Sequence, residues 1–290
     1  MRYTEPDAFR MALEARMRQA ADAQDRDLAR LRRTVAFDRF LARLAVSAHG
    51  AWLLKGGAAL QFRMPERARA TRDIDLAARA LADPADQLLE DLEADPFGDH
   101  FSFRVTGRRE LSDMPDRGIV LRLSVEARLG SRVFERFVVD VVRSAAAATD
   151  ADRVRLGEML DFADLPVVDI PVLDLATHWA EKLSAYLRRY DDRPNTRVKD
   201  LVDLVLLIEH GLAPDRRLHD EVVHTFINRQ QHLPVTLPSM AEEWAAPFTT
   251  MAVELGLHTR TAADAHATVQ QFWDAARELG DESDRGSHGT

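Results

Sequence analysis

The first third of the chain alternates between helical and strand-like patterns of apolar positions. Residues 5–33 are charged and free of glycine, and their apolar side chains recur at an approximate helical period, so one long helix is expected there. The complete predicted order is helix 5–33, helix 35–47, strand 51–54, a helix to about residue 63, a strand from Asp73, and a helix from Asp83 to about residue 94. The Asp83-Pro84 pair is a typical helix start.

From residue 101 the apolar positions follow a period of two, which predicts strands. Three segments rich in Val and Phe are expected as strands, at 101–105, 119–125 and 133–142, and Leu129 to Arg132 suits a hairpin between the last two. Beyond Ala145 only residues 166–172 favour a strand. Helical periodicity predominates afterwards, and helices are predicted at about 174–190, 197–211, 215–230, 239–255 and 262–279.

These elements predict an α+β protein in which a small mixed sheet precedes a helical C-terminal part. The predicted organisation is N-terminal helices at 1–48 packing on the core, a sheet domain at 49–148, a helical domain at 149–280 and a disordered tail at 281–290. The boundary between sheet and helical domains is expected near residues 145–165. The tail prediction rests on its Gly, Ser, Asp and Glu content without an apolar residue.

Composition narrows the class of protein. The chain has 290 residues, 46% of them hydrophobic, and no cysteine, so it can bury a sizeable core and forms no disulfide. No apolar run is long enough to cross a bilayer, and charged residues interrupt the N-terminus, so no membrane association and no secretory signal are expected. The sequence therefore predicts a cytoplasmic protein.

The formal net charge of −9 opposes nucleic-acid binding by the molecule as a whole. RNA binding would therefore require a local basic patch, and two groups of cations are candidates. They are Arg63, Arg67, Arg69 and Arg72 in one segment, and Arg188, Arg189, Arg193, Arg197 and Lys199 in another. The alternative is that these are solvated surface charges balanced by Glu66, Asp191 and Asp192.

Two glycines and two carboxylates form the most informative pattern. Gly56 and Gly57 lie between the strand at 51–54 and the following helix, where free backbone N–H groups would face an anion. Asp73 and Asp75 are two apart on a predicted strand, so both carboxylates point to one face. Side-by-side carboxylates are costly without a cation, so we expect a Mg²⁺ site, with Mn²⁺ as the other candidate. Lys55 either approaches phosphate or supports the glycine turn.

Further charged residues fall in apolar surroundings. Asp140 ends an apolar strand run, where a carboxylate requires a cation or an ion pair, and Arg122 or Arg143 could supply that pair. Lys182 lies on or beside the buried face of its helix, so its ammonium either reaches water or binds an anion. Asp200 and Asp203 share a helix face; Asp200 could complement the helix dipole and Asp203 could pair with Lys199.

The sequence lacks the motifs of several other enzyme classes. The ten histidines form no zinc-binding cluster, and no Walker loop, Rossmann fingerprint or Gly-x-Ser-x-Gly motif is present.

Three segments together resemble a known family. The segments are Lys55-Gly56-Gly57-Ala58-Ala59-Leu60 with Arg69 to Leu76, then Glu181 to Tyr186, then Arg197 to Leu204. In this order they resemble the motifs of the AbiEii/AbiGii-type toxin nucleotidyltransferases, the MenT group included, within the DNA polymerase β-like nucleotidyltransferase superfamily. The resemblance covers roughly residues 50 to 210 and implies a polymerase β-like nucleotidyltransferase domain.

The resemblance also implies roles for individual residues. Asp73 and Asp75 would bind the metal, and Asp140 would be the third carboxylate ligand and a candidate base. Lys55, Gly56, Gly57, Thr71, Arg72 and Lys182 would bind the NTP and its phosphates. Asp203 would contact the active site with Asp200 as a helper. Thr71 occupies a Ser/Thr position of the family motif that is phosphorylated in some relatives.

The implied activity is transfer of a nucleoside monophosphate from an NTP to an acceptor hydroxyl, with release of pyrophosphate. The resemblance further implies a toxin of a type IV-style toxin–antitoxin system. Its acceptor would be the 3′ end of tRNA, and its partner would be a cognate antitoxin protein. Two alternatives remain: a small-molecule nucleotidyltransferase of the antibiotic-modifying kind, and a catalytically silent nucleotide-binding regulatory module.

Overall fold

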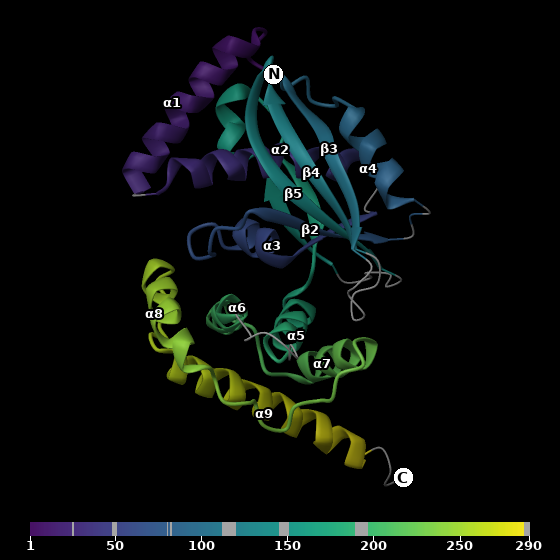
Figure 1. The fold of residues 1–290 in the computed structure, drawn as a ribbon, viewed down its shortest axis with the longest axis vertical. Coiled ribbons are helices and arrows are strands. Elements are labelled where there is room, and N and C mark those ends of the chain that lie inside the picture. The colour runs from purple at the N-terminus through teal and green to yellow at the C-terminus, as the bar shows by residue number, and fades with distance from the viewer. Residues whose placement is uncertain are drawn as a thin grey trace. The chain divides into compact units, whose positions relative to one another are not determined.

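The computed structural model describes residues 1–24, 26–47, 51–79, 81, 83–111, 120–144, 151–188 and 197–286. The elements are α1 (Pro6–Gln24), α2 (Leu28–Ser47), β1 (Trp52–Lys55), α3 (Gly56–Arg63), β2 (Asp73–Arg79), α4 (Pro84–Glu93), β3 (Phe101–Leu111), β4 (Val120–Leu129), β5 (Arg132–Ser144), β6 (Asp152–Leu156), η1 (Glu158–Ala163), β7 (Val168–Val172), α5 (Leu175–Tyr186), α6 (Val198–Glu209), α7 (Arg216–Asn228), η2 (Glu242–Trp244), α8 (Ala245–Glu254) and α9 (Ala262–Gly286). They form two compact units (Figure 1). Unit 1 is Met1–Arg63 with Ala70–Leu173, and unit 2 is Met64–Arg69 with Asp174–Thr290.

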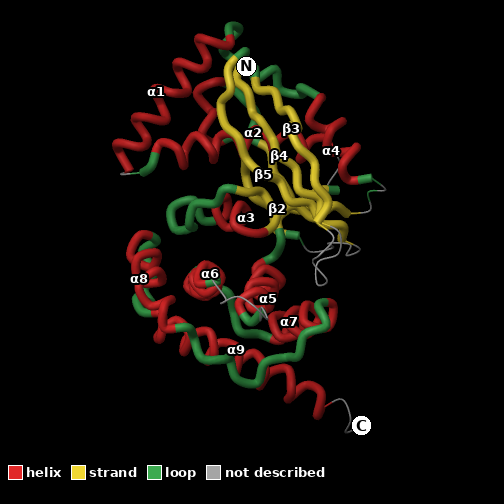
Figure 2. The backbone as a smooth tube through the Cα atoms, in the orientation of Figure 1, coloured by secondary structure: helices red, strands yellow, loops and turns green. Residues whose placement is uncertain are grey.

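The described residues of unit 1 form a seven-stranded mixed sheet in the order β3-β4-β5-β2-β1-β7-β6. The pairs β3–β4, β4–β5, β1–β2 and β6–β7 are antiparallel, whereas β2–β5 and β1–β7 are parallel. Figure 2 shows β3, β4 and β5 as long neighbouring strands. The prediction of a mixed sheet within an α+β protein is therefore confirmed at the level of a mixed α/β architecture.

One face of this sheet is buried because its strands alternate apolar and polar side chains. Leu121, Leu123 and Val125 of β4 are buried, as are Ile74 and Leu76 of β2. They form one core with aromatic residues of α2, and Phe37 and Phe40 both contact the Phe137 ring edge-on, at 5.0 and 5.4 Å between centroids. The opposite face of β2, β4 and β5 therefore presents the polar residues.

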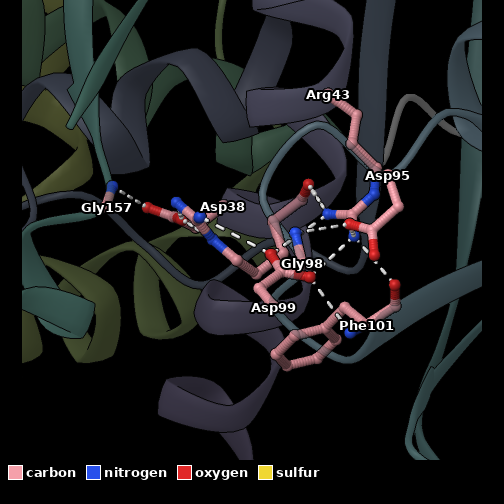
Figure 3. Close-up of polar contacts among 8 residues, drawn as sticks. Asp38, Arg43, Asp95, Gly98, Asp99, Phe101 and Gly157 are labelled. Carbon is pink, nitrogen blue, oxygen red and sulfur yellow. Dashed lines mark hydrogen bonds and ion pairs between the residues drawn. The ribbon is translucent and has the colours of Figure 1, made fainter. Parts of the chain in front are cut away.

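A buried ion network fixes α2 to the turns around the sheet (Figure 3). Arg43 of α2 donates to Asp99 Oδ1 at 2.7 Å and to the Phe101 carbonyl at 2.8 Å. Asp38 accepts from Arg39 Nε at 2.7 Å and from the backbone N–H of Gly157 at 2.6 Å. Because buried charges are stable only when paired, this network fixes the position of α2 against the sheet.

The N-terminal helices end and begin at different residues from those expected. The sequence predicted one helix over 5–33, but α1 ends at Gln24 and α2 begins at Leu28. Asp27 accepts a hydrogen bond from the Ala29 N–H at 2.9 Å, which is the geometry of a helix N-cap. The charged segment between α1 and α2 thus contains a helix N-cap, Asp27, which the apolar periodicity does not reveal.

Two strand predictions also differ from the structure. β3 extends to Leu111, beyond the predicted end at residue 105, and β6 lies where no strand was expected. In β6 only Val154 and Leu156 are buried and the alternating side chains are charged, so its apolar signal is weak. It joins the sheet by pairing with β7, a nonlocal contact that the five residues do not encode alone.

The described elements of unit 2 are helices, with Trp179, Leu183, Leu204 and Phe226 among its buried residues. The helical part begins at Asp174 rather than at residue 149, since β6, η1 and β7 belong to unit 1, and it also includes Met64–Arg69. Helix α9 continues to Gly286, into the segment predicted as a disordered tail. Residues 287–290 of that prediction lie outside the described residues.

No helix in the described ranges is both long enough and apolar enough to cross a membrane.

Candidate functional site

The predicted glycine turn lies directly between β1 and α3. Gly56 has φ +64°, a left-handed conformation that side chains rarely adopt, and it is the first residue of α3. A Cβ at this position would also lie 2.7 Å from Asp75 Cγ and closer still to Asp75 Oδ2. Gly56 therefore serves two purposes, since it turns the chain and leaves room for a carboxylate against the backbone.

Asp73 and Asp75 lie on β2 as the two-residue spacing predicted. Both are half-buried, whereas Ile74 between them is fully buried, so the carboxylates share the face opposite the core. Lys55 pairs in register with Asp75 across β1 and β2. The structure thus brings Lys55, Gly56 and the two carboxylates of the first motif together in unit 1.

Thr71 positions the first of these carboxylates. Its buried Oγ1 donates a hydrogen bond to Asp73 Oδ1 at 2.6 Å. The Thr71 N–H donates to Gln61 Oε1 of α3 at 3.4 Å, and Gln61 Nε2 donates to Thr34 Oγ1 of α2 at 2.6 Å. The Asp73 side chain is therefore held by a chain of hydrogen bonds that ends in the helical layer. Arg72, between Thr71 and Asp73, is exposed.

Asp140 lies beside Asp75 on the neighbouring strand, where the two residues are paired in register. Its carboxylate makes a bidentate ion pair with Arg122 of β4, with Nε–Oδ1 at 2.8 Å and Nη2–Oδ2 at 2.6 Å. Of the arginines considered from the sequence, Arg122 makes this pair. The hydrogen bonds with Asp140, and then the charges of Asp73 and Asp75, raise the pKa of Arg122.

The donor set of this face suits a hard divalent cation. Two carboxylates on one side of a strand, beside a helix N-terminus, match the way Mg²⁺ is held by one or two carboxylates together with substrate phosphates. Among the residues described, no group of three or more His, Asp or Glu side chains is arranged to hold a metal ion. Asp73 and Asp75 share one strand face, whereas the carboxylate of Asp140 is paired with Arg122.

Unit 2 brings the second and third motifs together. Lys182 of α5 is buried, and its Nζ contacts Asp200 Oδ1 at 3.0 Å and Asp203 Oδ2 at 2.7 Å, both on α6. Arg69 makes a bidentate pair with Asp203, at 3.0 and 2.9 Å, and Arg197 Nη1 lies 3.3 Å from Asp200 Oδ2. Asp203 therefore pairs with Lys182 and Arg69, rather than with Lys199, which was the alternative that the sequence offered.

The electrostatics of this cluster favour its charged form. Burial would raise the pKa of Asp203, but Lys182 and Arg69 outweigh burial and lower it. Burial would lower the pKa of Lys182, but Asp203 and Asp200 outweigh burial and raise it. When Arg69 and Arg197 are included, three cations of the described part of the chain face two carboxylates, which is a net charge of +1.

The sequence missed the partners of its candidates. Arg69 is one of the candidate RNA-binding cations in the sequence, but in the structure it binds Asp203. Arg67 and Arg63 pair with Glu209 and Asp152, respectively. The sequence predicts Arg122 only as a possible partner of Asp140 and gives no sign that the charges of Asp73 and Asp75 also act on it. No local signal gives this position, because it depends on the register between β4 and β5, which shifts between Ala127 and Arg128. Arg189 and Arg193 lie outside the described residues.

The two carboxylates and the glycine turn of unit 1 define a candidate nucleotide-binding site of the nucleotidyltransferase class. The sequence model of the AbiEii nucleotidyl transferase toxin family, described as part of type IV toxin–antitoxin systems, matches residues 39–277. The chain therefore belongs to the AbiEii nucleotidyltransferase toxin family, as its motifs predicted. Among curated proteins, none matches the chain.

Solved structures similar to this chain include two distant proteins. The crystal structure of JHP933 from Helicobacter pylori is 13% identical, covers 88% of this chain and 95% of its own, and gives a TM-score of 0.43. The crystal structure of an antigenic nucleotidyltransferase-like protein from Paracoccidioides brasiliensis is 16% identical, covers 81% of this chain and 96% of its own, and gives a TM-score of 0.37.

Proposed function

We propose that this protein is a divalent-metal-dependent nucleotidyltransferase that transfers a nucleoside monophosphate from an NTP to the 3′ end of tRNA. The observation that carries the proposal is the position of Asp75, whose carboxylate lies against Gly56 while sharing a strand face with Asp73. The two acids would supply a cation site, and the N-terminus of α3 would supply backbone N–H donors for phosphate oxygens. Membership of the toxin family supports the nucleotidyl transfer and an antitoxin partner.

In the proposed reaction, an acceptor hydroxyl oxygen attacks the α-phosphorus. A new P–O bond forms, the bond between the α-phosphorus and the bridging oxygen breaks, pyrophosphate leaves, and the hydroxyl proton passes to water. Asp73 and Asp75 would hold Mg²⁺, or Mn²⁺, which when bound would neutralise developing charge on the phosphates.

Other side chains of the chain orient the reactants in this proposal. Thr71 holds Asp73 in place through its 2.6 Å hydrogen bond, and Lys55 and Gly56 line the phosphate side of the turn. Lys182 is the proposed phosphate-binding cation of unit 2, held charged by Asp200 and Asp203. Asp140 is the proposed third ligand, which would require its release from Arg122.

The activity is tested by incubating the purified protein with Mg²⁺, each NTP labelled at the α-phosphate, and total tRNA. Label is expected on tRNA for the wild-type protein and not for Asp73→Asn or Asp75→Asn, because the isosteric amides remove charge and leave shape unchanged. Asp169→Asn is a matched control, since Asp169 is an exposed aspartate on β7 of the same unit. Labelling that survives Asp73→Asn would reject the proposed site.

The same experiment separates the other candidate functions. Transfer of label to a small hydroxylated antibiotic but not to tRNA would favour a small-molecule nucleotidyltransferase. NTP binding without transfer to either acceptor would favour a silent nucleotide-binding module. Omission of the divalent cation is expected to abolish labelling.

A further inference from the structure

The face of the sheet opposite the core carries five arginines on three adjacent strands. We call these residues the arginine face: Arg104 and Arg109 of β3, Arg122 and Arg128 of β4, and Arg136 of β5. Their common side follows from the cross-strand register, since residues paired between neighbouring strands project to the same face. Arg109 pairs with Arg122, and Arg104 pairs with Glu126, which in turn pairs with Arg136.

A β-bulge places both β3 arginines on this face. Arg104 and Arg109 are five residues apart, a spacing that would place them on opposite sides of a regular strand. The register shifts between Val105 and Gly107, so one extra residue restores the common side. Arg108 consequently points to the other face, where it lies 3.9 Å from Asp86 of α4.

The arginine face joins the candidate site through one row of paired residues. This row runs from Arg109 through Arg122 and Asp140 to Asp75. Adjacent strands are about 4.8 Å apart, so Arg122 lies two strand spacings, or about 10 Å, from Asp75 in backbone position. A chain lying on the arginine face can therefore end beside the two carboxylates of β2.

The charge of the arginine face is opposite to that of the whole protein. On the described residues of β3, β4 and β5, five arginines share this face with the carboxylates of Glu126 and Asp140, a net charge of +3, whereas the chain carries −9. Arg128 and Arg136 both bind Glu126, at 2.8 and 2.7 Å, and Arg122 binds Asp140. Arg104 and Arg109 are exposed and have no carboxylate partner among the described residues.

We propose that the arginine face binds the phosphodiester backbone of the nucleic acid whose end is the acceptor, and this inference rests on the proposed nucleotidyl transfer. Arginine forks match phosphate oxygens and bind them bidentately. Between Arg122 and Arg128 the strand spans about 20 Å, which is long enough to contact several successive phosphates. The partly exposed pairs with Glu126 are weak enough for phosphate to compete with them.

A structural role for the same arginines is the alternative. β3 is an edge strand, and charged side chains on edge strands prevent pairing with other chains. A charge on either face of β3 would serve that role, whereas phosphate binding requires the charges to lie on the arginine face. Arg108, which lies next to Arg109 on the other face, therefore distinguishes the two roles.

The test measures binding of a short fluorescein-labelled single-stranded RNA, and in a second arm DNA, by fluorescence anisotropy over a series of salt concentrations. The proteins are the wild type, Arg104→Gln/Arg109→Gln and the control Arg108→Gln, each checked for folding by circular dichroism. For the double variant we expect weaker binding and a salt slope lower by about 1.4, or about 0.7 for each single-strand phosphate that is no longer neutralised. Arg108→Gln should retain wild-type affinity and slope.

The proposal is overturned if the wild-type protein binds neither oligonucleotide, if the double variant binds like wild type, or if Arg108→Gln weakens binding equally. The two arms show whether the backbone of RNA or DNA is preferred. The proposed transfer activity fails separately: a wild-type protein that binds RNA through Arg104 and Arg109 but labels no acceptor retains the binding surface without the enzyme. Conversely, if the wild-type protein transfers label and the double variant binds the oligonucleotide like wild type, only the role of the arginine face is rejected.

Discussion

The carboxylate of Asp75 occupies the space that a side chain at Gly56 would fill. A Cβ added to Gly56 would lie 2.7 Å from Asp75 Cγ, and the φ of +64° already disfavours any other residue. Position 56 must therefore be a glycine to leave room for a carboxylate that follows it by nineteen residues in the sequence. The spacing of the motif has its physical basis in this contact between β2 and the start of α3.

Gly56→Ala is expected to displace Asp75 and abolish label transfer. It should also reduce the free energy of unfolding by more than the roughly 1–2 kcal/mol that a left-handed backbone costs a residue with a side chain. Gly98→Ala is the matched control, because Gly98 has φ +57° in the same unit but nothing within 4 Å of an added Cβ. Urea denaturation and the labelling assay measure both effects, and equal behaviour of the two variants would contradict the contact.

Arg122 is expected to compete with a divalent cation for Asp140. Its bidentate pair holds the Asp140 carboxylate, so Arg122→Gln should increase Mn²⁺ affinity several-fold, measured by the electron paramagnetic resonance signal of free Mn²⁺. The gain should disappear in Arg122→Gln/Asp140→Asn.

The control for this competition is Arg109→Gln, which removes the same charge in the same row without touching Asp140. If Arg109→Gln raises Mn²⁺ affinity as much as Arg122→Gln, the effect is general electrostatics and the pairing has no specific role. Loss of Mn²⁺ binding in Asp73→Asn would independently locate the cation on β2.

Thr71 is expected to act by positioning Asp73. Thr71→Val removes the hydroxyl that donates to Asp73 at 2.6 Å and preserves the shape, so label transfer should fall about tenfold, which corresponds to about 1.4 kcal/mol. Thr71→Ser keeps the donor and should recover most of the activity. If Thr71→Ser is as impaired as Thr71→Val, the methyl group rather than the hydrogen bond is what matters.

The buried carboxylate of Asp203 should make the protein sensitive to acid. Its pKa is lowered in the folded state, so its contribution to stability is present above the unfolded pKa of about 3.9 and is lost as pH falls through the folded value. Urea unfolding followed from about pH 7 down to about pH 2.5 should show stability falling below about pH 4. The raised pKa of Lys182 keeps its charge throughout this range.

Asp203→Asn should flatten this acid dependence. At neutral pH it should also cost about 3–5 kcal/mol, because Lys182 and Arg69 would lose the carboxylate that compensates their buried charge. Asp220→Asn, at an exposed position of α7, is the control and should leave the profile unchanged. If the loss of stability in acid is as steep in Asp203→Asn as in wild type, the acid dependence arises from other carboxylates.

Much of the local structure could be predicted because it depends on residues near one another in the chain. The period of two in β4 and β5, the glycine turn before α3 and the Asp83 cap of α4 are all short-range signals, and each corresponds to an observed element. The helix break near Asp27 and the strand β6 were missed, because a charged cap and a half-charged strand give weak apolar periodicity.

The candidate site likewise combines a feature that the sequence determines with contacts that it does not. The sequence alone determined that Asp73 and Asp75 share a face, since two residues on a strand project to the same side. It could not determine that Arg122 binds Asp140, because that pair depends on strand register set by distant residues. It also could not predict that Arg69 binds Asp203 across 134 positions of sequence.

The sequence by itself determined the family and the strand and helix periods, and it predicted the residues that we propose hold a cation and phosphate. Only the tertiary structure decided which charges meet, that Asp75 lies against Gly56, and that a bulge at Val105 to Gly107 places both Arg104 and Arg109 on the face of the β4 and β5 arginines. The physical reason is range: periodicity and turn signals act over a few residues, whereas ion pairs and strand register join segments that only folding brings together.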